Sequence, residues 1–515
     1  MDSRPDKTER VTIETALGRL AGQRKLGLFQ FKGIPYAQPP VGPMRWRMPQ
    51  AIAPWTDVRE ATRFAPIAPQ APTQIESLLG GSIGEQSEDC LYLNVWTPGC
   101  DGARRPVMVW IHGGAFVIGA GSQGIYNGKH LAARDVVVVT INYRLGAFGF
   151  LALAQATSGR APGSGTEGLA DQILALHWVK QNIAAFGGDA DNITVFGESA
   201  GAMSVSALLA SPPARGLFHK AIAQSGAGHI GLDPERASRA GRAMLAHLDI
   251  APEDAARAVE VPYGALIAAQ IAVIAESREG KDPHKLGSLP FQPAIDGAVL
   301  PQKPIDALRE GTAAGIPLLT GTNLQEWKLF SAPNPVLRFM TSRGFEERVI
   351  RIAKDAAPDV LAAYTEGSAF ERFNAMMTDK AFAVPAARML EAQAAHAPVY
   401  GYRFDWRSKL LGGILGSCHA LELGFVFGTY SEKLAGAFFG TGPAADTLSN
   451  AMMESWVAFA RTGNRATAAT GAWPRYDPAA RETMIFGDGP PHTLSAPNDA
   501  RRKAWDRVPE RKLGP

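Results

Sequence analysis

The sequence predicts an α/β fold built on a mostly parallel central sheet, and three observations support this prediction. Strand-like and helix-like segments alternate from Val11 to Leu209, an order typical of a parallel sheet covered by helices. Hydrophobic residues make up 46% of the 515 residues, which is enough for a large core. An apolar strand also turns directly into a helix around Ser199.

A glycine pair follows the first strongly apolar strand. Residues 106–111 (PVMVWI) predict a buried strand that ends at His112, Gly113 and Gly114. Glycines just past a strand end let successive backbone N–H groups point into a cavity. Gly113 and Gly114, with the N–H of Ala200, are therefore candidates to bind an oxyanion; an ordinary Gly-Gly turn is the alternative. We expect His112 to brace this loop by hydrogen bonds.

The next strand leads into the most informative motif of the chain. Residues 193–196 (ITVF) predict a strand, residues 202–209 (AMSVSALL) predict a helix, and GESAG joins them at 197–201. Such a sharp turn strains the backbone of Ser199 and exposes its hydroxyl at the positive end of the helix dipole. A chance Gly-x-Ser-x-Gly is the alternative, since the chain has 54 glycines. The flanking strand and helix favour a nucleophile elbow.

Two later strands precede an acid and a base. Residues 316–320 (IPLLT) predict a short strand, with Glu326 about five residues beyond its end. Residues 398–404 (PVYGYRF) predict another strand, and a glycine-rich loop containing His419 follows it. The expected chain order is serine, then acid, then histidine. The candidate triad in this order is Ser199, Glu326 and His419.

Helix-rich segments lie between these strands. Alanine-rich residues 233–275 and 336–394 are expected to pack beside or over the sheet and to shape the entrance to the site. The chain has no Ser/Gly linker, charge block or internal repeat that would separate domains. We therefore expect residues 1–515 to form one domain with its core at about 11–485.

Composition limits the partners and cofactors that can be expected. The net charge of +3 and the absence of basic runs interleaved with aromatics give no indication of nucleic acid binding. Two G-x-G-x-x-G matches, at 119–124 and 163–168, do not directly join a strand to a helix, so no dinucleotide cofactor is expected. No ligand spacing indicates a metal. The basic cluster at 501–512 is expected to be a solvated tail.

The ends of the chain and its cysteines bear on location. The polar N-terminus lacks the apolar segment of a signal peptide, and the apolar runs are far shorter than the roughly 20 residues that span a bilayer. Cys90, Cys100 and Cys418 form no disulfide framework. Cys90 and Cys100 have the option of pairing, but a reduced cytoplasmic protein that does not bind membranes is the simpler expectation.

Longer stretches of the chain resemble the type-B carboxylesterase family of the α/β-hydrolase fold. This family includes bacterial para-nitrobenzyl-type esterases, liver carboxylesterases and cholinesterases. The resemblance rests first on FGGDADNITVFGESAG at 186–201 and EDCLYLN at 88–94. Further matching stretches lie at 31–37, 142–150, 218–226 and 456–461, so the resemblance spans about 11–485.

The resemblance implies a serine esterase that forms an acyl-enzyme. It carries over Ser199, Glu326 and His419 as the triad. It also carries over the three candidate oxyanion donors, and it matches Glu198 and Ser225 to positions that support the triad. The implied partner is a small-molecule ester, with a monomer or a homodimer as the assembly. Activity is expected to fall below about pH 6.5 as the histidine is protonated.

Departures from the family pattern narrow the substrate. Residues 63–89 contain neither cysteine nor tryptophan, so the disulfide-closed loop and choline-binding tryptophan of cholinesterases are not expected. Gly424 stands where the family often has proline, which leaves the assignment of His419 intact. Where the family sets its acyl pocket, this chain has Gly287, Leu289 and Phe291. These residues predict a wider acyl pocket than that of cholinesterases.

Two alternatives stay open on the sequence alone. The same residues would cleave carbamates, amides, lactones or polyesters, and the sequence does not choose among them. The family also contains adhesion proteins that bind partners without catalysis. The complete set of Ser199, Glu326 and His419 argues against that second alternative.

Overall fold

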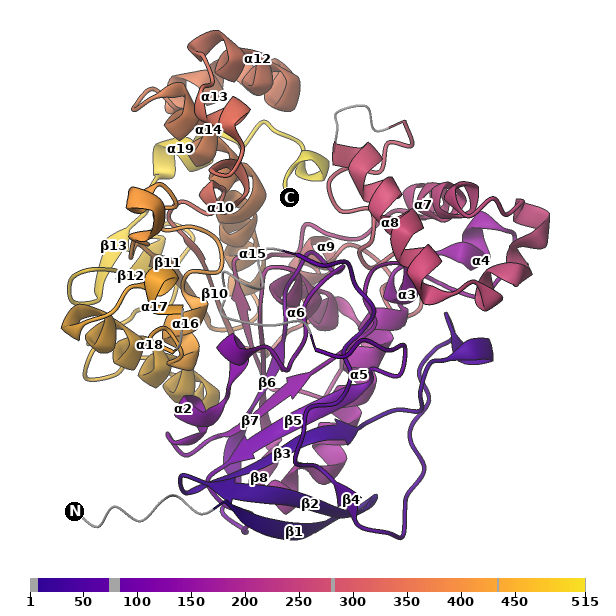
Figure 1. The fold of residues 1–515 in the computed structure, drawn as a ribbon. Helices are drawn as coiled ribbons and strands as arrows, with labels where there is room; N and C mark the ends of the chain where they lie inside the picture. Colours follow the sequence, from indigo (N-terminus) through magenta and orange to yellow (C-terminus); the bar gives the residue numbers. More distant parts are fainter. Residues whose placement is uncertain (1–7, 74–83, 279–282, 433–434, 515) are drawn as a thin grey trace.

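The structure, a computed structural model, describes residues 8–73, 84–278, 283–432 and 435–514. Within these residues thirteen strands form one sheet (Figure 1). The strands are β1 (Glu9–Thr15), β2 (Gly18–Lys25), β3 (Leu28–Pro35), β4 (Arg59–Glu60), β5 (Tyr92–Thr97), β6 (Arg105–Ile111), β7 (Val137–Ile141), β8 (Gly188–Glu198), β9 (Lys220–Gln224), β10 (Leu318–Asn323), β11 (Val399–Phe404), β12 (Glu482–Phe486) and β13 (His492–Ser495).

The centre of the sheet is parallel and its first edge is antiparallel. The strand order is β1-β2-β3-β5-β7-β6-β8-β9-β10-β11-β12-β13, with β4 beside β2. Neighbours from β7 to β12 are parallel, which confirms the mostly parallel sheet. The expected alternation with helices does not start at Val11, because β1, β2 and β3 form an antiparallel meander. The two-residue links between these strands are too short for a parallel crossover.

Helices cover both faces of the sheet and extend beyond it. The α-helices are α2 (Lys129–Ala132), α3 (Gly146–Gly149), α4 (Leu153–Ala156), α5 (Glu167–Asn182), α6 (Ala200–Ala210), α7 (Pro234–His247), α8 (Tyr263–Arg278), α9 (Pro304–Arg309), α10 (Lys328–Ser331), α11 (Pro335–Arg338), α12 (Ser342–Ala353), α13 (Ala357–Ala363), α14 (Ala369–Thr378), α15 (Val384–Ala394), α16 (Leu423–Phe427), α17 (Ala435–Phe439), α18 (Pro443–Thr462) and α19 (Asp499–Ala504). A π-helical turn, η7 (Asp379–Ala383), joins α14 to α15.

Successive side chains of the central strands point to opposite layers. In β6, Val107 and Val109 belong to a hydrophobic cluster that includes residues of α5 and α6, whereas Met108 and Trp110 belong to a second cluster that includes residues of α16 and α18. This period of two is that of a strand buried on both faces. The result is a helix–sheet–helix sandwich with α5 and α18 on opposite sides (Figure 1).

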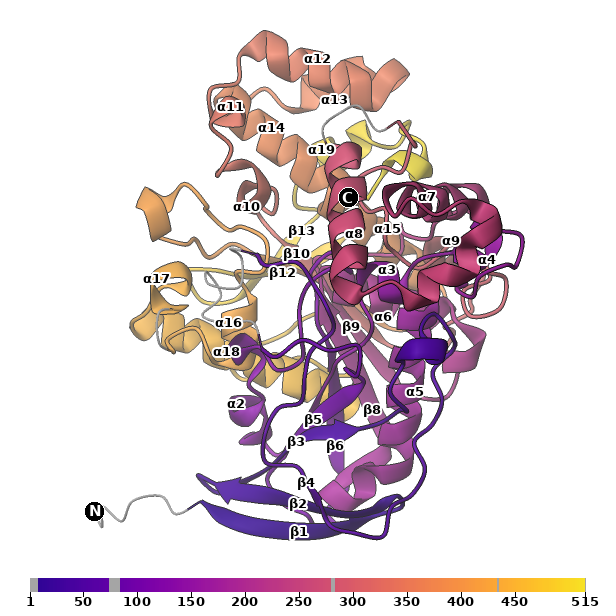
Figure 2. The same cartoon turned by 45° about the vertical axis from the view of Figure 1, so that its right-hand side comes forward.

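Two groups of helices stand away from the antiparallel edge of the sheet. Figure 2 shows α7 and α8 on one side and α11 to α14 at the top of the view, both far from β1 and β2. These helices occupy much of the two segments, 233–275 and 336–394, that the sequence marks as helix-rich.

The basic cluster at the end of the chain is not a solvated tail, and that prediction was wrong. Ala504, Trp505, Val508 and Leu513 join a hydrophobic cluster with residues of α12 to α14. Trp505 is fully buried. The arginines and lysines of this segment surround these apolar anchors, which a reading of charge alone does not detect.

Two further observations concern the environment of the chain. None of the helices in the described residues has the length and the apolar character needed to cross a membrane. Cys90, Cys100 and Cys418 are free thiols, so Cys90 and Cys100 do not pair.

Candidate active site

Ser199 lies at the apex of the turn between β8 and α6. Its backbone has φ 56° and ψ −124°, a strained conformation for a residue with a side chain. The start of α6 packs closely against the end of β6. A Cβ on Gly201 would lie only 2.0 Å from the carbonyl oxygen of Ile111. Ser199 is partly exposed, and its hydroxyl makes no hydrogen bond within the described part of the chain. The turn therefore holds an available hydroxyl in a fixed direction.

Glu326 is fully buried after β10 and accepts three hydrogen bonds. Its Oε1 accepts from the backbone N–H of Asn323 at 2.6 Å and from Ser225 Oγ at 2.6 Å. Its Oε2 lies 2.7 Å from Nδ1 of His419. The strand runs from Leu318 to Asn323 rather than over 316–320, so Glu326 lies closer to the strand end than the sequence predicts. Ser225 thus contacts the acid directly.

The loop that carries His419 is joined to the loop that carries Glu326. The N–H of Gln325 donates to the carbonyl of Ser417 at 2.9 Å, and the N–H of His419 donates to the carbonyl of Glu326 at 3.2 Å. Asn323 Nδ2 donates to the carbonyl of Cys418 at 2.7 Å. These bonds fix the two loops as one unit, although 93 positions separate the acid from the histidine.

The second ring nitrogen of His419 faces another carboxylate. Nε2 lies 3.1 Å from Oε1 of Glu198, the residue before Ser199. Burial alone would lower the pKa of His419, but Glu198, Glu326 and the nearby Glu422 outweigh burial and raise it to about 9. Burial, with help from Glu422 and Glu326, raises the pKa of Glu198 to about 8. The imidazole therefore holds its proton more tightly than a free histidine.

A buried polar network lies next to Glu326 and His419, and the sequence did not predict it. Glu422 is fully buried and accepts from Gln224 Nε2 at 3.1 Å and from Asn323 Nδ2 at 2.7 Å. Trp456 Nε1 donates to Gln224 Oε1 at 2.9 Å. Burial raises the pKa of Glu422 to about 7. The available sequence signal was the placement of Glu422 three residues after His419.

The two glycines after β6 lie against the elbow. A Cβ on Gly113 would lie 2.6 Å from the carbonyl oxygen of Glu198 and 3.0 Å from Cβ of Ser199. Within the described residues, the N–H groups of Gly113 and Gly114 donate no hydrogen bond. Ala200 is the first residue of α6, so its N–H has no acceptor inside the helix. These donors are therefore available next to the serine.

His112 braces this loop, as expected from the sequence. Its Nδ1 lies 2.8 Å from the carbonyl of Gly113, and its ring stacks on Tyr143 at 4.5 Å. Tyr143 Oη donates to the carbonyl of His112 at 2.8 Å. Burial lowers the pKa of His112 to about 4, so the ring is neutral near pH 7.

Aromatic rings that the sequence analysis missed flank His419. The ring centroid of Phe382 lies 4.9 Å from that of His419, and the centroid of Phe330 lies 5.3 Å away. Phe330 is 44% exposed, so this apolar wall reaches the surface. The sequence around Phe330 and Phe382 contains no motif that predicts these contacts. The contacts depend on how the helices that carry the two rings pack above the sheet.

The three residues predicted for the acyl pocket lie between α8 and α9. Phe291 is fully buried, Leu289 is half-buried against the main core, and Gly287 has φ 71°. A Cβ on Gly287 would meet the guanidinium of Arg236 at 2.4 Å. The role of these three residues as an acyl pocket stays a prediction. Among the described residues, no group of acidic, histidine or cysteine side chains is arranged to hold a metal.

Comparison with known proteins gives one consistent family. The model of the carboxylesterase family matches residues 8–505. The para-nitrobenzyl esterase of Bacillus subtilis is 42% identical over 92% of this chain and 94% of its own length. A phenmedipham hydrolase of Pseudarthrobacter oxydans is 35% identical over 93% of this chain and 95% of its own. A carboxylesterase structure from Geobacillus stearothermophilus superposes with a TM-score of 0.86 at 39% identity, covering 96% of this chain and all of that one.

Proposed function

The chain belongs to the carboxylesterase family, has the α/β-hydrolase fold and hydrolyses carboxylic esters, and from this premise we propose which residues perform the reaction. Ser199 is the nucleophile, His419 is the general base and then the general acid, and Glu326 orients the imidazole. The observation that carries this proposal is the contact of 2.7 Å between Glu326 and Nδ1 of His419, made beside a strained serine elbow.

The reaction proceeds through an acyl-enzyme. His419 accepts the proton of Ser199 as Oγ attacks the ester carbonyl, and Glu326 stabilises the imidazolium that forms. The N–H groups of Gly113, Gly114 and Ala200 bind the oxyanion of the tetrahedral intermediate. The alcohol leaves with the proton from His419, and water then attacks the acyl-enzyme by the same route.

Glu198 supports this cycle from the other side of the imidazole. Its carboxylate lies 3.1 Å from Nε2 of His419, so it stabilises a positive charge on the ring. For the attack, Nε2 has to accept the hydroxyl proton of Ser199, and catalytic hydrogen bonds commonly tighten only when substrate binds. Ser225 holds Glu326 in place through its own hydrogen bond.

The substrates that we propose are carboxylic esters of small to medium size. Gly287, Leu289 and Phe291 would form an acyl pocket wider than one walled by aromatic rings. A second candidate substrate is phenmedipham, because one relative over nearly the whole chain is named a phenmedipham hydrolase. Amides, lactones and polyesters are further classes that the same chemistry would cleave.

Hydrolysis of 4-nitrophenyl esters, from acetate to decanoate, tests the assignment of Ser199. We expect kcat of Ser199→Ala to fall by roughly 10⁴–10⁶. Ser204→Ala is the matched control, because Ser204 lies one turn further along α6 and accepts a hydrogen bond from Gln172. The optimum in chain length measures the acyl pocket, and phenmedipham is assayed beside the esters. Equal rates in Ser199→Ala and wild type would remove Ser199 as the nucleophile.

We also propose a cytoplasmic protein that acts as a monomer or a homodimer. The free thiols of Cys90, Cys100 and Cys418 support a reducing compartment. Size-exclusion chromatography with light scattering measures the assembly, and a larger oligomer would overturn this part of the proposal.

A further inference from the structure

A π-helical turn places a phenylalanine against the ring of His419. The turn η7 interrupts the helical run between α14 and α15, a kind of irregularity that is frequent at functional sites. Phe382 belongs to this turn, and its ring centroid lies 4.9 Å from that of His419. The N–H of Trp327, next to Glu326, also donates to Thr378 Oγ1 just before the turn, at 3.1 Å. The position of η7 therefore affects both the histidine and the acid.

The start of η7 is held by residues 499–514, which we name the C-terminal strap. Asp379, the first residue of η7, is buried and forms an ion pair of 2.9 Å with Arg501. Asp379 also accepts a hydrogen bond from Tyr364 Oη at 2.6 Å. Trp505 Nε1 donates to the same Tyr364 oxygen at 2.8 Å. The strap thus reaches the buried carboxylate directly and through a tyrosine.

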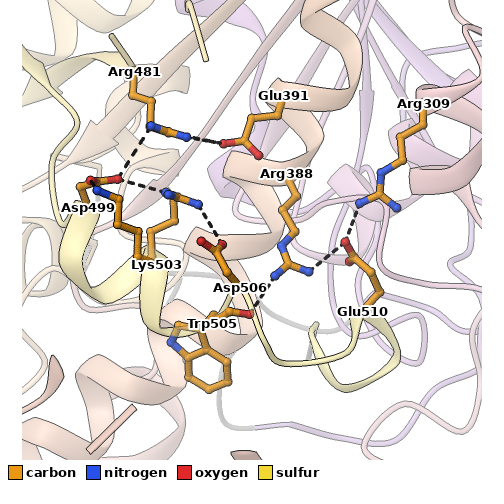
Figure 3. A network of polar contacts seen from close by, with 10 residues as sticks. Arg309, Arg388, Glu391, Arg481, Asp499, Lys503, Trp505, Asp506 and Glu510 are labelled. Carbon is orange, nitrogen blue, oxygen red and sulfur yellow. Dashed lines mark hydrogen bonds and ion pairs between the residues drawn. The ribbon is translucent and has the colours of Figure 1, made fainter. Parts of the chain in front are cut away.

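The strap also holds the rest of the turn and the helix after it. The N–H of Gly514 donates to the carbonyl of Lys380 at 3.0 Å, and Lys380 Nζ donates to the carbonyl of Gly514 at 2.5 Å. In α15, Arg388 donates to the carbonyl of Trp505 at 2.9 Å and pairs with Glu510 at 2.8 Å (Figure 3). Both sides of η7 are therefore fixed to one segment.

A second contact ties the strap to the loop after β9. Glu510 pairs with His229, and Arg309 of α9 joins the same carboxylate. His229 lies four residues beyond Ser225, whose hydroxyl donates to Glu326. The strap consequently touches the segment that carries a hydrogen-bond partner of Glu326 as well as the turn that carries Phe382.

We propose that the C-terminal strap positions the pair formed by His419 and Glu326, with Arg501 and Tyr364 as positioning residues. The proposal rests on the proposed triad and goes beyond it. In the described residues, no hydrogen bond or ion pair joins the strap to Ser199, so we expect the strap to act on turnover through the orientation of the imidazole rather than on substrate binding. Small displacements of a catalytic group that originate far from the reacting atoms lower turnover strongly.

Two variants loosen the strap and a third is the matched control. Arg501→Gln removes the ion pair with Asp379, and Tyr364→Phe keeps the ring but removes the bridging hydroxyl. Arg507→Gln removes an ion pair with Asp359 from the same strap, where the arginine side chain is 69% exposed and does not contact η7. We expect kcat to fall about tenfold in the first two variants with KM within about twofold of wild type, a pattern that reports loss of transition-state stabilisation. We expect Arg507→Gln to match wild type.

Two additional readouts separate positioning from simple loss of structure. Titration with diethyl 4-nitrophenyl phosphate counts the reactive sites, so kcat refers only to folded enzyme. Proton NMR follows the Nδ1–H of His419, assigned by its loss in His419→Ala, and we expect its resonance to broaden or shift in Arg501→Gln and Tyr364→Phe. If Arg501→Gln does not fold, the result for Tyr364→Phe alone tests the proposal.

The proposal is overturned by either of two results. One is that kcat per reactive site and the NMR resonance match wild type in a folded variant. The other is that only KM changes. Failure of the proposed triad would look different, because Ser199→Ala would then keep its activity whatever the strap variants show.

Discussion

Replacing Glu198 with glutamine tests whether this carboxylate sets the pH range of catalysis. Oε1 of Glu198 lies 3.1 Å from Nε2 of His419, and both groups are buried. Glutamine keeps the size of the side chain and removes its charge. In the proposed mechanism His419 has to be neutral to accept the proton of Ser199, so activity is expected to be lost as the pH falls through the pKa of His419. That pKa is raised to about 9, with Glu198 the strongest of the groups that raise it.

The size of the effect follows from Coulomb's law. Two unit charges about 4 Å apart interact by about 4 kcal/mol at an effective dielectric constant of about 20, which corresponds to about three pKa units. Glu198 has a raised pKa of about 8 and carries only part of its charge near neutral pH. We therefore expect Glu198→Gln to lower the pKa of the acid limb by roughly one to two units.

The assay is kcat/KM for 4-nitrophenyl acetate across about pH 5 to pH 10, because this ratio reports the free enzyme. Wild type should lose activity below a pKa well above 6.5, the ordinary value for histidine, rather than below about pH 6.5 as expected from the sequence alone, because neighbouring carboxylates raise the pKa of His419. Glu198→Gln should lose it at lower pH and reach a lower plateau, since the imidazolium in the transition state has lost a neighbouring charge. An acid limb at the same pH in both proteins would refute the reasoning.

Three further outcomes are expected from the site and the strap. Ser225→Ala removes one of three donors to the buried Glu326 and should lower kcat about tenfold, as expected for a hydrogen bond of roughly 1.5 kcal/mol to a charged group; steady-state kinetics with unchanged kcat would contradict this. Gly113→Ala places a Cβ 2.6 Å from the carbonyl oxygen of Glu198 and 3.0 Å from Cβ of Ser199. This clash should displace the N–H of residue 113 and cost on the order of 10²–10³ in kcat, as the loss of one oxyanion donor does, and a fully active variant would contradict a role for Gly113 in the oxyanion site. Burial alone would raise the pKa of Glu510, but the hydrogen bonds and charges of His229 and Arg309 outweigh burial and hold that pKa well below its usual value. Its contribution to stability is present above the ordinary pKa of about 4.3 and is lost as the pH falls through the lowered pKa. Thermal unfolding of Glu510→Gln should therefore start about 1–2 °C lower near neutral pH, with a difference that shrinks in acid; a difference that grows in acid would contradict the sign.

The sequence was sufficient to predict the turn at Ser199, because local strand and helix preferences and tertiary packing require the same conformation there. The run ITVF favours a strand, and only glycine fits at Gly201, where a Cβ would meet the carbonyl of Ile111. The strained φ of Ser199 follows from the same motif. Chain order then selected Glu326 and His419 as candidates for the acid and the base, and in the structure Oε2 of Glu326 lies 2.7 Å from Nδ1 of His419.

Other features depend on contacts that no local pattern encodes. The strand β10 extends through Gly321 to Asn323, two residues of types that are depleted in strands. Both pair with β11, and Gly321 also pairs with β9 on the other side. Tertiary pairing overrides propensity in such a case. Phe382 reaches His419 only because η7 lies over the sheet. Trp505 is buried by helices far away in the sequence, so charge patterning around it suggested an exposed tail.

The most direct test of the central claim identifies the residue that becomes covalently modified. Wild type is treated with diethyl 4-nitrophenyl phosphate, digested, and mapped by peptide mass spectrometry, with Ser199→Ala treated in parallel. The account expects one phosphoryl adduct on Ser199, loss of esterase activity in proportion to that adduct, and no adduct in Ser199→Ala. An adduct on another residue that tracks the loss of activity, or full inactivation with Ser199 unmodified, would contradict the assignment of the nucleophile.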